Sequence, residues 1–162
     1  MAKTGYSRLQ IRLHWTVVGL VTLMFVMHDG IANAFDAGMD SGMLQISPPV
    51  IGHFVGGALI LFLTMWRFQI RNEQGVPPAS DGEPALFARL SKIAHLAFYV
   101  ILFLLPMTGA VAWGNASAQA SFAHEILRAV LFFLIIGHVG AVLIHQIIWK
   151  TGVITRMIRP DG

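Results

Sequence analysis

Four long apolar runs constrain this chain more than any other feature of its sequence. Each has close to the roughly 20 residues that an α-helix, rising about 1.5 Å per residue, needs to cross the hydrocarbon core of a bilayer. The runs span residues 11–27, 50–66, 93–113 and 126–149. Only 12% of the 162 residues are charged, about half the share in a soluble domain. The sequence therefore predicts an all-α integral membrane four-helix bundle, in a single domain over residues 1–162, with helices at about residues 8–28, 50–70, 90–113 and 124–150.

Basic residues lie almost entirely on one side of these spans. Only Arg128 lies near the opposite face, and the others are Lys3, Arg8, Arg12, Arg67, Arg71, Arg89, Lys92, Lys150, Arg156 and Arg159. By the positive-inside bias, both termini and the 67–92 segment are predicted to be cytoplasmic. The isoelectric point of about 9.8 does not indicate nucleic-acid binding, because no basic stripe with interleaved aromatics occurs. We expect contact with membrane lipid and none with nucleic acid.

The first run also has features of a secretory signal. Basic residues precede it, and Ala32-Asn33-Ala34 has the small-residue pattern of a cleavage site. Cleavage would leave three spans, and the basic segments would then no longer all lie on one side of the membrane. A retained first helix is therefore preferred. Glycine and proline in residues 28–49 and 72–88 predict an irregular outer loop and a cytoplasmic linker. Pro106, inside the third run, is expected to kink its helix.

Histidine is the residue type that indicates a binding site in this chain. The seven histidines lie within or at the ends of apolar runs: His14, His28, His53, His95, His124, His138 and His145. An imidazole in hydrocarbon is unfavourable unless it is hydrogen-bonded or binds a metal. A hydrogen bond to a neighbouring helix explains one such residue well, but not five or six. The chain has no cysteine, so thiolate-bound clusters and thioether-linked haem are excluded. No H-x-x-x-H or H-E-x-x-H motif indicates zinc, which leaves haem iron as the preferred metal.

Spacing along the fourth run offers ligands at two depths. His124 and His138 are fourteen residues apart, so they share one helix face about 21 Å apart along its axis. His53 enters the second span from the outer side, which makes it the natural partner of His124. His14 enters from the cytoplasmic side and matches either His138 or His145 in depth. Glycines that would let a flat macrocycle approach the backbone lie beside two of these histidines: Gly52, Gly56 and Gly57 near His53, and Gly137 and Gly140 near His138. The pattern predicts two b-type haems, and the glycines favour His138.

Several motifs together resemble one known family. They are Tyr6-Ser7-Arg8-Leu9-Gln10-Ile11, Leu13-His14-Trp15, Gly52-His53, Ala94-His95-Leu96, Leu105-Pro106-Met107-Thr108-Gly109, His124-Glu125, Gly137-His138, His145 and Trp149-Lys150. Their order, over residues 6–160, is similar to that of the bacterial di-haem cytochrome b561 family. The resemblance implies two haem b groups, the inner one held by His14 and His138 and the outer one by His53 and His124. It also implies electron exchange with ubiquinone near the cytoplasmic haem. The best characterised members oxidise superoxide at the periplasmic side.

The same resemblance leaves His95 and His145 without a ligand role, near Arg67 at the cytoplasmic end. An imidazole there can hydrogen-bond a quinone carbonyl and supply a proton, because it titrates near neutral pH. Arg67 is fourteen residues from His53 on one helix face, so it could contact quinone, neutralise a haem propionate, or act only as a topology signal. His28 has no role in the family and is expected to be an interfacial residue.

Two functions follow as hypotheses for a bacterial inner-membrane protein of this kind. The first is a superoxide:ubiquinone oxidoreductase, favoured by the small size and short outer loops. The second is a cytochrome b electron-transfer subunit that links the quinone pool to a periplasmic dehydrogenase or another redox protein partner. The outer side argues against steering of the superoxide anion, because Arg128 alone faces four acidic residues, Asp29, Asp36, Asp40 and Glu125. A structural four-helix protein without redox function would lack haem absorption.

Overall fold

The computed structural model describes residues 5–78 and 84–160, which form helices and no strand. The helices are α1 (Arg8–Val26), α2 (His28–Ser41), α3 (Pro48–Gln74), α4 (Ala85–Gly114), α5 (Ala118–Ile147) and α6 (Val153–Arg156). Four of them, α1, α3, α4 and α5, are long and apolar enough to cross a membrane. The predicted all-α fold with four spans is confirmed. The spans differ from the predicted bounds by up to six residues. α3, for example, continues through the polar residues 71–74 beyond its apolar run.

Local signals explain where the helices begin. Ser7 caps α1 in a capping box, in which its hydroxyl accepts from the Gln10 backbone N–H and the Gln10 side chain accepts from the Ser7 N–H. Prolines occupy the first turn of α3, where a missing N–H costs no helical hydrogen bond. Ser117 caps α5 by accepting from the Ala120 N–H. α4 continues through Pro106 from Ala85 to Gly114.

The prediction of an irregular outer loop over residues 28–49 is wrong for its first part, which forms α2. This 14-residue helix buries Phe35 and Gly38 and ends at Gly42, whose φ of 72° is the left-handed conformation that favours glycine. Hydropathy missed α2 because the helix is amphipathic rather than apolar. The predicted 72–88 linker is also shorter, since α3 runs to Gln74 and α4 begins at Ala85. Residues 79–83 of that linker lie outside the described residues.

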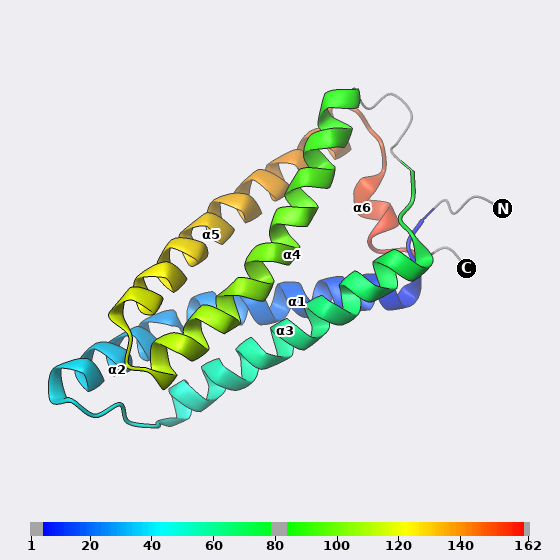
Figure 1. Ribbon diagram of the computed structural model, residues 1–162. Coiled ribbons are helices and arrows are strands. Elements are labelled where there is room, and N and C mark those ends of the chain that lie inside the picture. The colour runs from blue at the N-terminus through cyan, green and yellow to red at the C-terminus, as the bar shows by residue number, and fades with distance from the viewer. Residues whose placement is uncertain (1–4, 79–83, 161–162) are drawn as a thin grey trace.

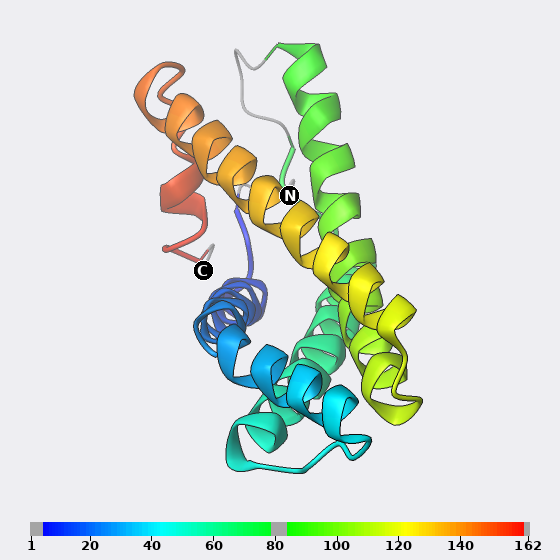
Figure 2. The ribbon, with the colours of Figure 1, turned by 90° about the vertical axis from the view of Figure 1, so that its left-hand side faces the viewer.

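The helices pack in sequence order. α1 lies against α3, α3 against α4, and α4 against α5, while α2 covers one end of α3. Figure 2 shows α5 crossing beside α4 and away from α1. The α1–α5 pair is joined through core side chains rather than by close backbone packing, because Val17 and Val21 of α1 and Leu131 of α5 belong to one buried cluster. The backbones of α1 and α5 therefore approach each other less closely than those of the other neighbouring spans.

Different elements meet at the two ends of the bundle. At one end, Trp15 Nε1 donates to the Met157 carbonyl at 2.8 Å and Gln10 Nε2 donates to the Gly75 carbonyl at 3.0 Å. The start of α1, the end of α3 and α6 therefore meet there, as Figure 1 shows. α2 lies at the opposite end. Following the predicted topology, we call these the inner end and the outer end.

An apolar layer separates the two ends. Its buried side chains are Val17, Val21, Ile60, Ile101, Leu102 and Leu131. Ile60 lies seven residues from both His53 and Arg67, and Leu131 lies seven from both His124 and His138. Seven residues are almost two helical turns, about 10 Å. The histidines of α3 and α5 and the partly exposed Arg67 thus lie above and below this layer.

Candidate functional site

The outer level brings together His53 of α3 and His124 of α5. Their ring centres are 6.2 Å apart and their planes meet at 61°. An imidazole nitrogen binds a first-row metal at about 2 Å, so two rings on opposite sides of one metal have centres about 6 Å apart. The predicted outer pair thus has the separation that a shared iron requires.

α4 provides no ligand at this level, yet it orients His124. Nδ1 of His124 lies 2.9 Å from the Leu105 carbonyl and 3.2 Å from the Thr108 hydroxyl. Because a carbonyl can only accept, Nδ1 carries the proton and Nε2 is left to bind a metal. Gly109 makes the room, since a Cβ there would lie 3.3 Å from the His124 ring. From the sequence, Pro106 was expected to kink its helix, and no role in orienting a histidine was predicted for Gly109.

A cavity of about 300 Å³ opens beside these rings. His53 and His124 line it with Gly57 and many apolar side chains, and it lies at the lower end of the range for ligand pockets. Nδ1 of His53 is buried without a hydrogen-bond partner among the described residues. A buried polar ring atom left without a partner is unfavourable, so a group bound in the cavity could supply a partner to this nitrogen.

The glycines divide into two groups. At Gly57, Gly137 and Gly140, an added Cβ would meet nothing within 4 Å, as expected where a macrocycle approaches the backbone. Gly52 and Gly56 do not fit that expectation, because Met27 and Met24 of the α1 side lie against them. These two glycines allow α1 and α3 to pack closely. The rotation of α3 about its axis decides which of its glycines face α1, and the sequence alone does not give that rotation.

The inner level gathers residues from four helices. His95 of α4 packs edge-on against His138 of α5, with ring centres 5.7 Å apart, and Phe98 packs on the same ring at 5.4 Å. His14 of α1 lies within electrostatic range of both histidines. Nδ1 of His95 lies 2.6 Å from the Ser91 carbonyl, so it donates there and leaves Nε2 free. The structure therefore groups the predicted ligands His14 and His138 with His95.

Arg67 of α3 contacts His14 directly. Its Nη1 lies 2.9 Å from His14 Nδ1, and a guanidinium can only donate. Nδ1 of His14 therefore accepts, and the neutral ring carries its proton on Nε2. This is the opposite tautomer from His124. Metal binding through Nε2 of His14 requires the ring proton to move to Nδ1, and Arg67 must then leave Nδ1. The inner site therefore needs a rearrangement before it can bind a metal, whereas His124 at the outer site does not.

His145 lies farther toward the inner end of α5. Its ring packs edge-on against Trp149 at 4.6 Å, and its Nδ1 lies 3.2 Å from the Thr151 hydroxyl. It is seven residues beyond His138, which corresponds to about 10 Å along the helix. The structure thus places His145 beside the start of the C-terminal segment, whereas His95 lies against His138.

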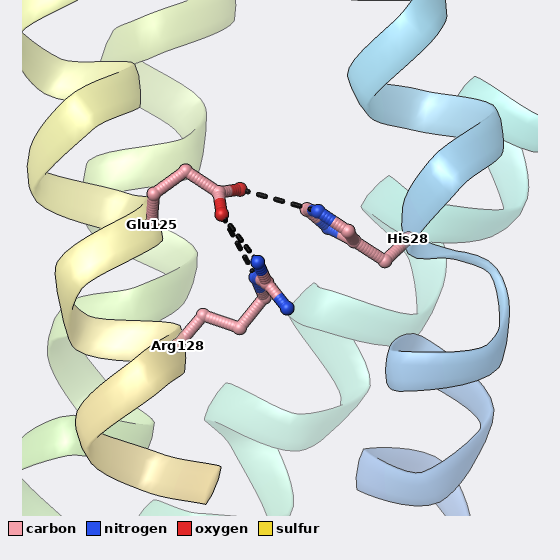
Figure 3. Close-up of polar contacts among 3 residues, drawn as sticks. All are labelled: His28, Glu125 and Arg128. Carbon is pink, nitrogen blue, oxygen red and sulfur yellow. Dashed lines mark hydrogen bonds and ion pairs between the residues drawn. The ribbon is translucent and has the colours of Figure 1, made fainter.

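Three residues form a polar group at the outer cavity that the sequence did not predict as a unit (Figure 3). Glu125 lies 2.6 Å from Arg128 Nη2 and accepts from its Nε at 3.0 Å, and its other oxygen lies 3.5 Å from His28 Nε2. All three line the cavity of His53 and His124. His28 is therefore more than an interfacial residue. Glu125 offsets the charge of Arg128. The signal available in the sequence was the i, i+3 spacing of Glu125 and Arg128 beside His124.

Comparisons with known proteins identify the family of this chain. A family model described as prokaryotic cytochrome b561 matches residues 5–160. The chain is 32% identical over 161 residues to cytochrome b562 of Cereibacter sphaeroides, covering 96% of both chains. It is 27% identical over 174 residues to the probable superoxide oxidase CybB of Yersinia pestis, covering 94% of this chain and 95% of the relative. The chain is thus a multi-pass, electron-transferring haem protein of the bacterial inner membrane that belongs to the prokaryotic cytochrome b561 family.

Proposed function

We propose that this chain holds two haem b groups and carries electrons across the membrane from periplasmic superoxide to ubiquinone at the cytoplasmic side. His53 and His124 would hold the outer haem, and His14 and His138 the inner one. Each haem would supply a one-electron carrier at its level of the bundle. The observation that carries the proposal is the placement of histidines at two levels on either side of one apolar layer.

The choice of ligands rests on ring geometry. His53 and His124 have the separation and, for His124, the tautomer that iron needs. At the inner level His138 lies within range of His14, whereas His145 lies about two turns away along α5. His95 has its Nδ1 engaged by its own helix and lies beside His138. We assign it to quinone because the resemblance to the family gives the inner ligand positions to His14 and His138, not because of its own hydrogen bond.

The apolar layer has a function of its own in this proposal. Val17, Val21, Ile60 and Leu131 are at most 9% exposed and form one cluster with α4. The apolar side chains of this layer offer no hydrogen-bond partners for water, so no chain of water molecules can carry a proton across it with the electron. Electrons can tunnel between the levels, while the protons that complete quinol are taken up at the inner end. His95 and His145 are the candidate contacts for ubiquinone there, and Arg67 is a candidate contact for the quinone or for a haem propionate.

The superoxide assignment is supported by the probable superoxide oxidase among the relatives and by the outer cavity that reaches His53 and His124. Stopped-flow spectroscopy of the purified protein with superoxide tests it, with and without a soluble quinone. We expect haem reduction within milliseconds, followed by reoxidation when quinone is present. Absence of any reduction by superoxide would rule out this donor and leave the fold and the haem ligands untouched.

A second function, a cytochrome b subunit that exchanges electrons with a periplasmic redox protein, is favoured by one feature of α2. Asp29, Asp36 and Asp40 recur at seven- and four-residue intervals and are all exposed, so they lie on one face. Such a face attracts a cationic protein and repels an anion. Stable co-purification with a soluble redox protein, weakened by salt and by Asp36→Asn, would support this function. Rapid reduction by superoxide without any partner would argue for the first.

A further inference from the structure

The inner end holds a cluster of arginines that the proposed ligands and quinone contacts do not explain. Arg71 lies one turn beyond Arg67 on α3, and Arg156 belongs to α6. Tyr6, just before α1, lies within electrostatic range of all three guanidinium groups. Residues from the start of α1, the end of α3 and the C-terminal segment thus converge on one spot, which Figure 1 shows as the meeting point of these elements.

The surroundings of Tyr6 are partly shielded from water. Burial raises the pKa of the Tyr6 phenol, and the arginine charges oppose that rise. Arg67, Arg71 and Arg156 are themselves only partly exposed. Like charges that are brought together out of water repel more strongly than on an open surface. The cluster therefore needs compensation by an anion.

The described part of the chain supplies no such anion. Its ion pairs involve only Glu125, at the outer end. Glu73, the nearest acidic residue to Arg71 in sequence, is exposed and accepts from Gln69 at 2.9 Å. Arg67 instead donates to His14, and Arg156 donates to the Pro78 carbonyl at 3.2 Å. Partly buried cations without a carboxylate indicate a place for a ligand oxyanion.

We propose that Tyr6, Arg71 and Arg156, together with Arg67, form an oxyanion site that binds the propionate carboxylates of the inner haem. The inference rests on the proposed function, because it takes His14 as an inner ligand. Arg67 is in direct contact with His14, so the cluster is continuous with the inner histidines. Guanidinium groups bind carboxylates in paired, charge-assisted hydrogen bonds, and a phenol adds a further donor.

The site also accounts for the tautomer of His14. A carboxylate is a stronger acceptor for a guanidinium than a neutral imidazole is. Binding of the propionates would therefore draw Arg67 away from His14 Nδ1. The ring could then carry its proton on Nδ1 and present Nε2 to the metal, as His124 does at the outer level.

The test compares the double variant Arg71→Gln/Arg156→Gln with Arg12→Gln, measured by spectroelectrochemical redox titration and by the rate of haem loss to apomyoglobin. Arg12 is exposed on α1 near the same end, so it removes a nearby charge without touching the cluster. We expect the double variant to lower the midpoint potential of one haem, because cations favour the state that has gained an electron. We also expect that haem to be lost about tenfold faster, the effect of one charge-assisted hydrogen bond. Arg12→Gln should change neither quantity.

His14→Ala separates this inference from the proposed function. Loss of one haem in His14→Ala supports the proposed inner ligand. If the double variant then behaves like Arg12→Gln, the oxyanion site is wrong and the haem assignment survives. If His14→Ala keeps both haems, both the inner ligand and the oxyanion site are overturned.

Two further arms identify the anion. The same titrations in nanodiscs of phosphatidylcholine, with and without phosphatidylglycerol, test a lipid phosphate as the source. A shift that appears only with phosphatidylglycerol would overturn the propionate assignment. Asp81 and Glu83 come between α3 and α4 in the sequence and Asp161 follows α6, and all three lie outside the described residues. If the variant Asp81→Asn/Glu83→Gln/Asp161→Asn raises the midpoint potential of that haem, these carboxylates are the counterions of the cluster and the proposal fails. Unchanged potentials in both arms support it.

Discussion

The outer and inner levels of the bundle use the same residue type in opposite electrostatic settings. At the outer level, the His124 proton is directed to a backbone carbonyl, and Arg128 is paired with Glu125. At the inner level, His14 accepts from Arg67, and no carboxylate of the described residues pairs with the arginines nearby. The outer site is thus close to charge balance before any cofactor is considered, whereas the inner site is cationic.

This difference has a consequence for electron flow. A cationic environment stabilises whichever redox state carries the extra electron, so it raises the reduction potential of a group bound there. The inner level should therefore have the higher potential of the two. Electrons that enter at the outer end would move inward without an energy input, in the direction that quinone reduction requires.

The largest effect should come from removing a ligand at either level. His124→Ala and His138→Ala are each expected to lose one of two haems and about half of the Soret absorption, because no other imidazole of α5 lies at the same level of the bundle. His28→Ala, at the same outer cavity, is the matched control and should keep both haems. Haem content per chain, measured as the pyridine haemochrome, shows whether each variant has lost a haem. Two intact low-spin haems in His124→Ala would break the two-level comparison altogether.

The outer level should also respond to a single methyl group on α4. Gly109→Ala puts a Cβ 3.3 Å from the His124 ring, so either the ring or the helix must shift, at a cost of about 1–3 kcal/mol. We expect altered electron paramagnetic resonance of one haem and a lower melting temperature. Gly114→Ala on the same helix, where an added Cβ meets nothing within 4 Å, should have neither effect. Equal behaviour of the two variants would show that α4 does not position His124.

The four spans and the two histidine levels could be predicted from the sequence because they depend on local quantities. Hydropathy identifies α1, α3, α4 and α5, and the rise of a helix gives the distance between His124 and His138. The partners of each side chain depend instead on how the helices rotate against one another. For that reason the Arg67–His14 contact and the packing of Gly52 and Gly56 against methionines were not predicted. α2 was missed because its burial comes from tertiary contact rather than from composition.

Charge at the outer cavity should have a moderate effect and separates the two proposed functions. Glu125→Gln removes the carboxylate that offsets Arg128, and it leaves the cavity more positive. If superoxide is the donor, we expect its second-order rate of haem reduction to rise severalfold at low ionic strength and Arg128→Gln to lower it. The difference should shrink in 0.5 M salt because of screening. A basic redox protein as donor would show the reverse order of the two variants.

The smallest effect should appear at the contacts that gather the inner end. Trp15 Nε1 donates to the Met157 carbonyl at 2.8 Å, and Trp15→Phe removes this hydrogen bond while keeping most of the ring. A single hydrogen bond contributes about 1 kcal/mol, which corresponds to about 2–4 °C in melting temperature for a chain of this size. Trp66→Phe, a partly exposed tryptophan of α3, is the control and should stay within about 1 °C. Both variants should keep both haem potentials unchanged, because neither removes a charge or a ligand. A shift of the inner potential in Trp15→Phe alone would mean that the C-terminal segment helps set the charge of the inner level, and α6 would then belong to that site together with Arg156.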